Sequence, residues 1–217
     1  MLKRTMHIGI DDTDSTKSGC TTYVAALLVE KLIKLKTEFT DYPNLIRLNP
    51  NVPWKTRGNG ALCLRFNYEQ ELEDTIKETA LDMLETNADL EAKGTDPGIV
   101  FLNKSNIPKE ITAFAKNAMT GIVTLKEAVR LITKYKAEAL GYNSCRGVIG
   151  ALAAIGENLH GDHTYELIAY RTLENRGTKR RIDKNSIINM DQQTQPCTFN
   201  NVDYEKKRVI ITPRGPD

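Results

Sequence analysis

The chain has 217 residues, 40% of them hydrophobic and 27% charged, and its formal net charge is +2 at pH 7. A chain of this length can build one large or two small hydrophobic cores, and no apolar run is long enough to cross a bilayer. The first six residues are too few and too polar for a secretory signal, and the four cysteines include no Cys-x-x-Cys pair. We therefore expect a cytoplasmic protein with reduced thiols, in which any nucleic-acid partner would meet a local basic patch.

The first part of the chain alternates between predicted strands and helices. Met6–Ile10 is a short apolar strand, and Cys20–Lys36 carries apolar residues at helical spacing. The same patterns predict an amphipathic helix over Glu69–Leu84, and strands over Leu45–Leu48, Ala61–Phe66 and Gly98–Leu102. The resulting order, β-α-β-β-α-β, predicts a two-layer α/β sandwich.

The second part of the chain is richer in predicted helices. Helices are predicted over Pro108–Met119, Leu125–Lys136 and Gly147–Asn158, followed by strands over Tyr165–Arg171 and Arg208–Thr212. The segment 175–201 is basic at its start and then polar, which predicts a long loop. Gly121 is the best candidate for a domain boundary, so we expect an α+β protein with domains 1–120 and 121–217.

Three carboxylates, Asp11, Asp12 and Asp14, follow the first predicted strand directly. Such a cluster is costly through charge repulsion unless a cation lies among the oxygens, and hard oxygen ligands suit a partly hydrated Mg²⁺. The alternative is a solvated turn that caps the next helix, because Asp, Ser and Thr are common in turns. Thr21, at the predicted helix start, would then be an ordinary N-cap.

A second polar segment lies between the predicted strands at 45–48 and 61–66. Lys55 and Arg57 supply positive charge, and Gly58 and Gly60, on either side of Asn59, allow close approach of backbone N–H groups to an anion. Asn-Gly is also a strong hairpin signal, so the loop is predicted to connect two strands whether or not it binds a ligand.

A third candidate is Arg146-Gly147 at the start of a Gly- and Ala-rich helix. An Arg beside a helix N-terminus favours an anion, whereas Gly150 and Gly156 favour close helix packing. The chain contains no Gly-Lys-Ser/Thr phosphate loop and no Gly-x-Gly-x-x-Gly motif after a strand. An ATP site here would therefore be of an unusual kind.

Taken together, these segments resemble the archaeal tRNA-Ile agmatidine synthase (2-agmatinylcytidine synthetase, TiaS) family. The resemblance rests on blocks that keep their order over nearly the whole chain, namely Ile8–Ser15, Cys20–Tyr23, Leu45–Pro50, Lys55–Ala61, Arg146-Gly147, Ile149–Ala154 and Glu166–Arg171. It implies an ATP-dependent ligase that attaches agmatine to C2 of the wobble cytidine of an isoleucine tRNA. It also implies a kinase-like first domain and a ferredoxin-like second domain that is incomplete in this chain, with nucleic-acid-binding folds beyond it.

The resemblance also implies roles for the motif residues. A threonine at the position of Thr21 is phosphorylated in the family, although Thr22 could take this role. The implied Mg²⁺ ligands and catalytic acids are Asp11, Asp12 and Asp14, and the implied ATP-phosphate ligands are Lys55, Arg57, Gly58, Asn59, Gly60, Arg146 and Gly147. Binding of isoleucine tRNA is expected to need the further domains, and nothing in the sequence identifies how agmatine is held.

Two other functions fit the same residues. One is an RNA-binding module without catalysis, whose loops hold phosphate backbone and whose binding would weaken steeply with salt. The other is a Mg²⁺-dependent nucleotide enzyme that acts on a small molecule and demands the metal. The oligomeric state is open.

Overall fold

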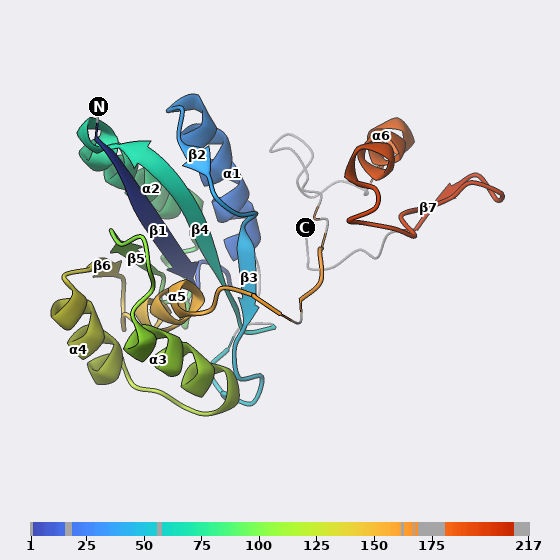
Figure 1. Cartoon of the computed structure of the whole chain (residues 1–217). Helices are drawn as coiled ribbons and strands as arrows, with labels where there is room; N and C mark the ends of the chain where they lie inside the picture. Colours follow the sequence, from blue (N-terminus) through green and yellow to red (C-terminus); the bar gives the residue numbers. More distant parts are fainter. Residues whose placement is uncertain are drawn as a thin grey trace. The chain divides into compact units, whose positions relative to one another are not determined.

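The structure, a computed structural model, describes residues 2–15, 19–55, 58–161, 163–166, 168 and 181–210. The chain forms two compact units, Met1–Leu159 and His160–Asp217, and the expected boundary at Gly121 lies inside the first (Figure 1). Within the described residues, no helix is both long and apolar enough to span a membrane.

The first unit is built on an antiparallel sheet. Its strands are β1 (Lys3–Asp11), β2 (Glu38–Phe39), β3 (Asn44–Arg47), β4 (Gly60–Glu69), β5 (Gly98–Leu102) and β6 (Glu138–Gly141). The strand order is β2-β4-β1-β5-β6, and β3 also pairs with β4. The apolar runs of β1, β4 and β5 explain their central places, because all five residues of β5 and five consecutive residues of β1 are buried.

Helices cover both faces of this sheet (Figure 1). On one face lie α1 (Thr21–Lys34) and α2 (Glu73–Asn87), the latter preceded by the short 3-10 helix η1 (Gln70–Leu72); on the other lie α3 (Lys109–Thr120), α4 (Leu125–Tyr135) and α5 (Gly147–Gly156). The α+β class is confirmed, but the unit has three layers where the sequence predicted two. The reason is that α4 and α5, predicted to belong to a second domain, pack together with α3 on the first sheet.

Helix α5 owes its close approach to the sheet to small residues. A Cβ on Gly9 of β1 would lie 1.9 Å from the Ala151 carbonyl oxygen, and a Cβ on Gly98 of β5 would lie 2.1 Å from the Val148 nitrogen. At the other end of the helix, the buried Arg65 guanidinium donates to the carbonyl oxygens of Ala154 and Ile155. The helix is thus fixed at both ends within the first unit.

The second unit contains α6 (Lys184–Thr194) and a hairpin of β7 (Val202–Asp203) and β8 (Arg208–Val209). The loop predicted over 175–201 is wrong where α6 forms, because Asp183 caps the helix by accepting a hydrogen bond from the Asn185 amide at 2.9 Å. Of the strand predicted at 165–171, the described residues Tyr165, Glu166 and Ile168 form no strand, and the rest lie outside the described residues.

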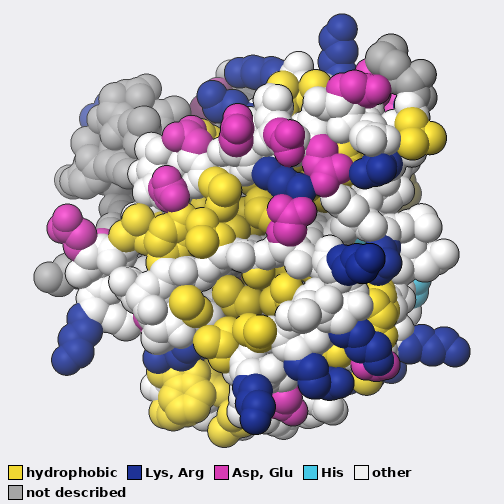
Figure 2. All heavy atoms as spheres, turned by 90° about the vertical axis from the view of Figure 1, so that its left-hand side faces the viewer, with side chains coloured by type: hydrophobic (Ala, Val, Ile, Leu, Met, Phe, Trp, Pro, Cys, Tyr) yellow, Lys and Arg dark blue, Asp and Glu magenta, His cyan; other side chains and the backbone are white. Residues whose placement is uncertain are grey.

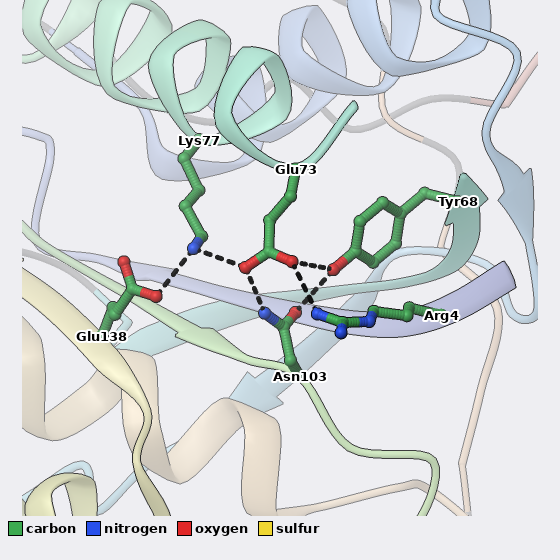
Figure 3. Close-up of polar contacts among 6 residues, drawn as sticks. All are labelled: Arg4, Tyr68, Glu73, Lys77, Asn103 and Glu138. Atoms are coloured by element: carbon green, nitrogen blue, oxygen red, sulfur yellow. Dashed lines mark hydrogen bonds and ion pairs between the residues drawn. The ribbon is translucent and has the colours of Figure 1, made fainter. Parts of the chain in front are cut away.

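The turn that carries Asp11, Asp12 and Asp14, here called the acidic turn, lies at one end of the sheet. At the other end, a network of polar side chains connects neighbouring strands and α2 (Figure 3). Glu73 at the start of α2 accepts hydrogen bonds from Lys77, Tyr68 and Asn103, and Lys77 also pairs with Glu138 at the start of β6. Burial acts to raise the pKa of Glu73, but the hydrogen bonds outweigh it and lower the pKa. Because this carboxylate is so fully satisfied, the cluster serves as structural support for the sheet.

Candidate active site at the end of the sheet

The strand register brings the predicted motifs to one end of the sheet. Asp11 at the end of β1 lies opposite Gly98 at the start of β5, and Ile10 lies opposite Leu62 near the start of β4. Gly98 in turn lies opposite Gly141 at the end of β6. The acidic turn, the loop that precedes β4 and the segment that leads from β6 into α5 therefore emerge at the same end of the sheet.

Asp11 lies against the backbone of α5. Its Oδ2 atom occupies the space beside Gly150, where a Cβ would lie only 1.8 Å from that oxygen. Burial, and next the negative charge of Asp12, raise the pKa of Asp11 to about 8. Gly150 was predicted to be a packing residue, which the structure confirms, but the group packed against it is a carboxylate of the site.

Asp12 has a left-handed backbone with a φ of +57°, a conformation that Asp tolerates better than most residues. Its carboxylate accepts a hydrogen bond from the Asp96 amide at 3.2 Å and lies 3.9 Å from Nη2 of Arg146. Burial raises the pKa of Asp12 to about 6, in spite of this hydrogen bond and of the Arg146 charge.

Arg146 joins the acidic turn to the segment before β5. Its Nη2 pairs with the Asp96 carboxylate and donates to the Gly94 carbonyl oxygen at 3.0 Å. Its Nε is buried and has no hydrogen-bond acceptor among the described residues. An uncompensated buried donor is costly, so this atom is well suited to a ligand oxygen.

Asp96 also lies in this candidate site, although its place in the sequence does not indicate it. Its carboxylate accepts from the Ser144 amide at 2.8 Å and pairs with Arg146, while its carbonyl oxygen accepts from the Gly147 amide at 2.9 Å. Its position before Pro97 indicates an ordinary turn, and only the strand register brings it to Asp12.

Gly147 differs from its predicted role. Its amide is already bonded to Asp96, and a Cβ would lie 2.3 Å from the Gly98 nitrogen, so glycine is needed here for close packing. Gly156 is likewise a packing glycine, as predicted, with a Cβ position 2.4 Å from the Ile111 carbonyl oxygen.

Thr21 is the first residue of α1, and its buried hydroxyl faces the acidic turn. Its Oγ1 lies 3.1 Å from Oγ1 of Thr13. The hydroxyl of Thr22 lies instead 2.9 Å from Sγ of Cys20. The helix cap residue is Cys20, whose side chain makes no capping hydrogen bond. Thr21 is therefore not an ordinary N-cap.

Asp14 is tied to the same region by its carbonyl oxygen, which accepts a hydrogen bond from the Thr95 hydroxyl at 3.0 Å.

The loop before β4 contacts the end of β3 and the residue that follows it. Asn59, with a φ of +48°, takes the left-handed conformation, and its carbonyl oxygen accepts from the Leu48 amide at 2.8 Å. Cβ positions on Gly58 and Gly60 would lie 2.9 and 3.2 Å from Nη1 of Arg47. Lys55 is exposed, and Arg57 lies outside the described residues.

The carboxylates fit a hard cation by their chemistry. Within the described ranges, no three acidic, His or Cys side chains form a group that could hold a metal ion. Mg²⁺, however, commonly uses only one or two carboxylates and completes its shell with water and substrate phosphate oxygens. The raised pKa values of Asp11 and Asp12 show that a nearby positive charge would stabilise their ionised forms.

Comparison with known proteins decides which family combines these features. The family model of the TiaS TCKD domain matches residues 7–144, and that of the TiaS FLD domain matches residues 145–217. The chain belongs to the TiaS family. The boundary between the two TiaS domain models falls just before α5, although α5 packs on the sheet of the first unit.

Several TiaS relatives are similar over almost the whole chain. The isoleucine-tRNA 2-agmatinylcytidine synthetase TiaS of Pyrococcus horikoshii is 45% identical over 212 residues, which cover 98% of this chain and 49% of that protein. The TiaS of Methanocaldococcus jannaschii is 42% identical over 217 residues, which cover 97% of this chain and 50% of that protein. The chain thus spans about half the length of the curated relatives it matches.

Solved structures agree with this assignment. A complex of TiaS with its isoleucine tRNA and ATP matches with a TM-score of 0.78 at 38% identity, covering 98% of this chain and 50% of that one. A complex of TiaS with the same tRNA, AMPCPP and agmatine also has a TM-score of 0.78, at 36% identity, covering 98% of this chain and 51% of that one.

Proposed function

We propose that this chain is the ATP-binding part of an isoleucine-tRNA 2-agmatinylcytidine synthetase, an ATP-dependent ligase that works in the cytoplasm. In the complete reaction, agmatine would be joined to C2 of the wobble cytidine of isoleucine tRNA. The observation that carries the proposal is the convergence of Asp11, Asp12 and Arg146 at one end of the sheet, in a chain that belongs to the TiaS family.

The ATP phosphates would lie between the acidic turn and Arg146. The buried Nε of Arg146 offers a donor, and the start of α5 adds the positive end of its dipole. Lys55 and Arg57, with the backbone of Gly58–Gly60, would approach from the loop before β4. Such positioning and charge neutralisation supply most of what phosphoryl transfer needs.

Asp11 and Asp12 would hold Mg²⁺, with Asp14 nearby. When bound, the ion would neutralise charge on the phosphate oxygens. Both carboxylates must be ionised to hold the ion, and the pKa of each is raised when no ion is bound. Binding of Mg²⁺–ATP would therefore release protons and be tighter at pH 8 than at pH 6.

Two phosphoryl transfers follow from the family resemblance. In one, Oγ1 of Thr21 bonds to the γ-phosphorus, the bond to the β-phosphate oxygen breaks, ADP leaves, and the hydroxyl proton passes to a neighbouring carboxylate or water. In the other, the cytidine C2 oxygen bonds to the γ-phosphorus of ATP while the bond to the β-phosphate oxygen breaks. The agmatine amine then bonds to C2, the C2–O bond breaks, inorganic phosphate leaves, and the amine proton passes to water or a neighbouring carboxylate. Thr21 is well placed for the first, because its hydroxyl faces Thr13 in the acidic turn.

Calorimetric titration of the 217-residue chain with ATP tests this proposal. We expect saturable binding that requires Mg²⁺ and that Asp12→Asn weakens at least 100-fold. Asp74→Asn, an exposed position on α2, is the matched control and should bind as the unchanged chain does. Equal affinity of the Asp12→Asn variant and the control would contradict the proposed site, and strong binding without Mg²⁺ would contradict the role of the carboxylates.

A further inference from the structure

Strand β6 forms one edge of the sheet in the first unit. Among the described residues it pairs only with β5, so its outer row of backbone N–H and C=O groups has no strand beside it. Ala139 and Leu140 are exposed, and Leu140 is 41% accessible. An open edge with apolar side chains is a site where another strand can add, and natural proteins usually protect such edges.

An apolar groove of about 600 Å³ runs along this edge on the side of α4 and α5. Val129 and Ile132 of α4 and Val148 of α5 line it, with Ala139 and Gly141 of β6. Val129 is 48% accessible although its side chain is wholly hydrocarbon. Because the β6 residues on this side are so small, the groove has room for large side chains from a neighbouring strand.

The opposite side of the same edge is acidic. Glu138 and Leu140 point toward α2, because they lie opposite Phe101 and Ile99, whose side chains pack with that helix. Helix α2 carries five carboxylates and one lysine, and its Lys77 is already paired with Glu73 and Glu138. Figure 2 shows this face, a band of hydrophobic side chains with acidic side chains and a few basic ones above it, and several Lys and Arg side chains below it.

We propose that β6 is a docking edge for an extended protein segment that alternates large apolar residues with basic ones. The apolar side chains would enter the groove beside α4, and the basic ones would lie over Leu140 and reach the carboxylates of α2. A second copy of β6 is a poorer occupant, because its Ala139 and Gly141 would leave the groove unfilled and its Glu138 would add negative charge.

The probe for this surface is a labelled nine-residue peptide, blocked at both ends, in which valine or leucine alternates with lysine. Fluorescence anisotropy with the 217-residue chain should show saturable binding. A peptide with glutamate in place of lysine should bind at least tenfold more weakly, as should a peptide of the same composition with its apolar residues grouped at one end. Only the alternating peptide can place both side-chain types correctly on a pleated strand.

Val129→Glu places a charge in the groove at an exposed position and should weaken binding at least tenfold. Ile33→Glu is the matched control, since Ile33 is 58% accessible on α1, a helix that lies on the other face of the sheet. Circular dichroism verifies that both variants fold. Absence of saturable binding, or equal binding to the two variants, would overturn the proposal. A dimer in sedimentation that Val129→Glu dissolves would overturn it in favour of a second copy.

Discussion

The Asp11 carboxylate fills the notch left by the missing side chain of Gly150, with Oδ2 only 1.8 Å from the position of a Cβ on that glycine. A residue of the acidic turn and a residue of a buried helix, 139 positions apart in the chain, thus fit together as one piece of the site. The fit couples the packing of α5 to the position of a carboxylate, so we expect the candidate site to be sensitive to a single methyl group at Gly150.

Gly150→Ala should therefore destabilise the chain by about 1–3 kcal/mol, the usual range for overpacking, and weaken ATP binding. Urea denaturation and calorimetry measure the two effects. Gly121→Ala is the control, since a Cβ there meets only the Asn117 carbonyl oxygen at 3.3 Å, and it should change neither quantity by much. If Gly150→Ala behaved like Gly121→Ala, the close contact with Asp11 would be wrong.

Stability should fall as the pH rises from 6.5 to 8 in the absence of divalent cations. A raised carboxyl pKa means that the folded state holds more protons than the unfolded state between the two pKa values, so folding loses free energy as the pH rises through that window. With the pKa of Asp11 at about 8, the loss should be about 1–2 kcal/mol. His7, with its pKa lowered to about 4, acts in the opposite direction mainly below pH 6.5 and offsets only about 0.4 kcal/mol above it.

Urea midpoints at the two pH values measure this loss. Asp12→Asn removes the neighbouring negative charge that helps to raise the pKa of Asp11, so the variant should lose less stability over the same interval. A steeper loss in the variant would show that the two carboxylates do not repel one another.

Arg146→Met should weaken ATP binding at least tenfold and also destabilise the fold by about 1–3 kcal/mol. The second effect arises because Asp96 and Asp12 lose their cation and Gly94 loses a hydrogen-bond donor. Arg130→Met, on the exposed surface of α4, is the matched control for loss of one positive charge. ATP affinity that falls equally in both variants would point to a general charge effect and away from a specific contact.

Phosphate should appear on Thr21 when the chain is incubated with ATP and Mg²⁺, as read by mass spectrometry. Thr21→Val should abolish the modification, whereas Thr22→Val should leave it, because the Thr22 hydroxyl faces Cys20. Phosphate on Thr22 in the unchanged chain would reverse the assignment of these neighbours.

The chain alone should bind isoleucine tRNA weakly, with a shallow salt dependence. Its formal charge is only +2, and it spans about half the length of its relatives, so part of their phosphate contacts would be missing. Filter binding at physiological salt measures the affinity. Nanomolar binding would mean that the residues present here already form an RNA surface.

Much of the fold follows from sequence periodicity. The apolar run of β5 was predicted with its observed bounds, and the acidic turn was predicted from three carboxylates at the end of an apolar strand. Neither β6 nor the role of Asp96 could be predicted in this way. The residues of β6 are exposed and lack alternation, so only pairing with β5 makes them a strand. The place of Asp96 in the candidate site depends on contacts with Asp12 and Arg146, which are 84 and 50 positions away in the chain.

The contacts of Arg65 and of the small residues of α5 also bear on where the chain could be cut without exposing its core. A cut at the family boundary after Ser144 would remove α5 and lay bare Val100, Leu102 and Cys63, which are buried in the same core as the helix. It would also leave the Arg65 guanidinium without the Ala154 and Ile155 carbonyl oxygens. The first compact unit extends to Leu159, so the boundary between the two family models and the boundary between the two compact units fall at different residues.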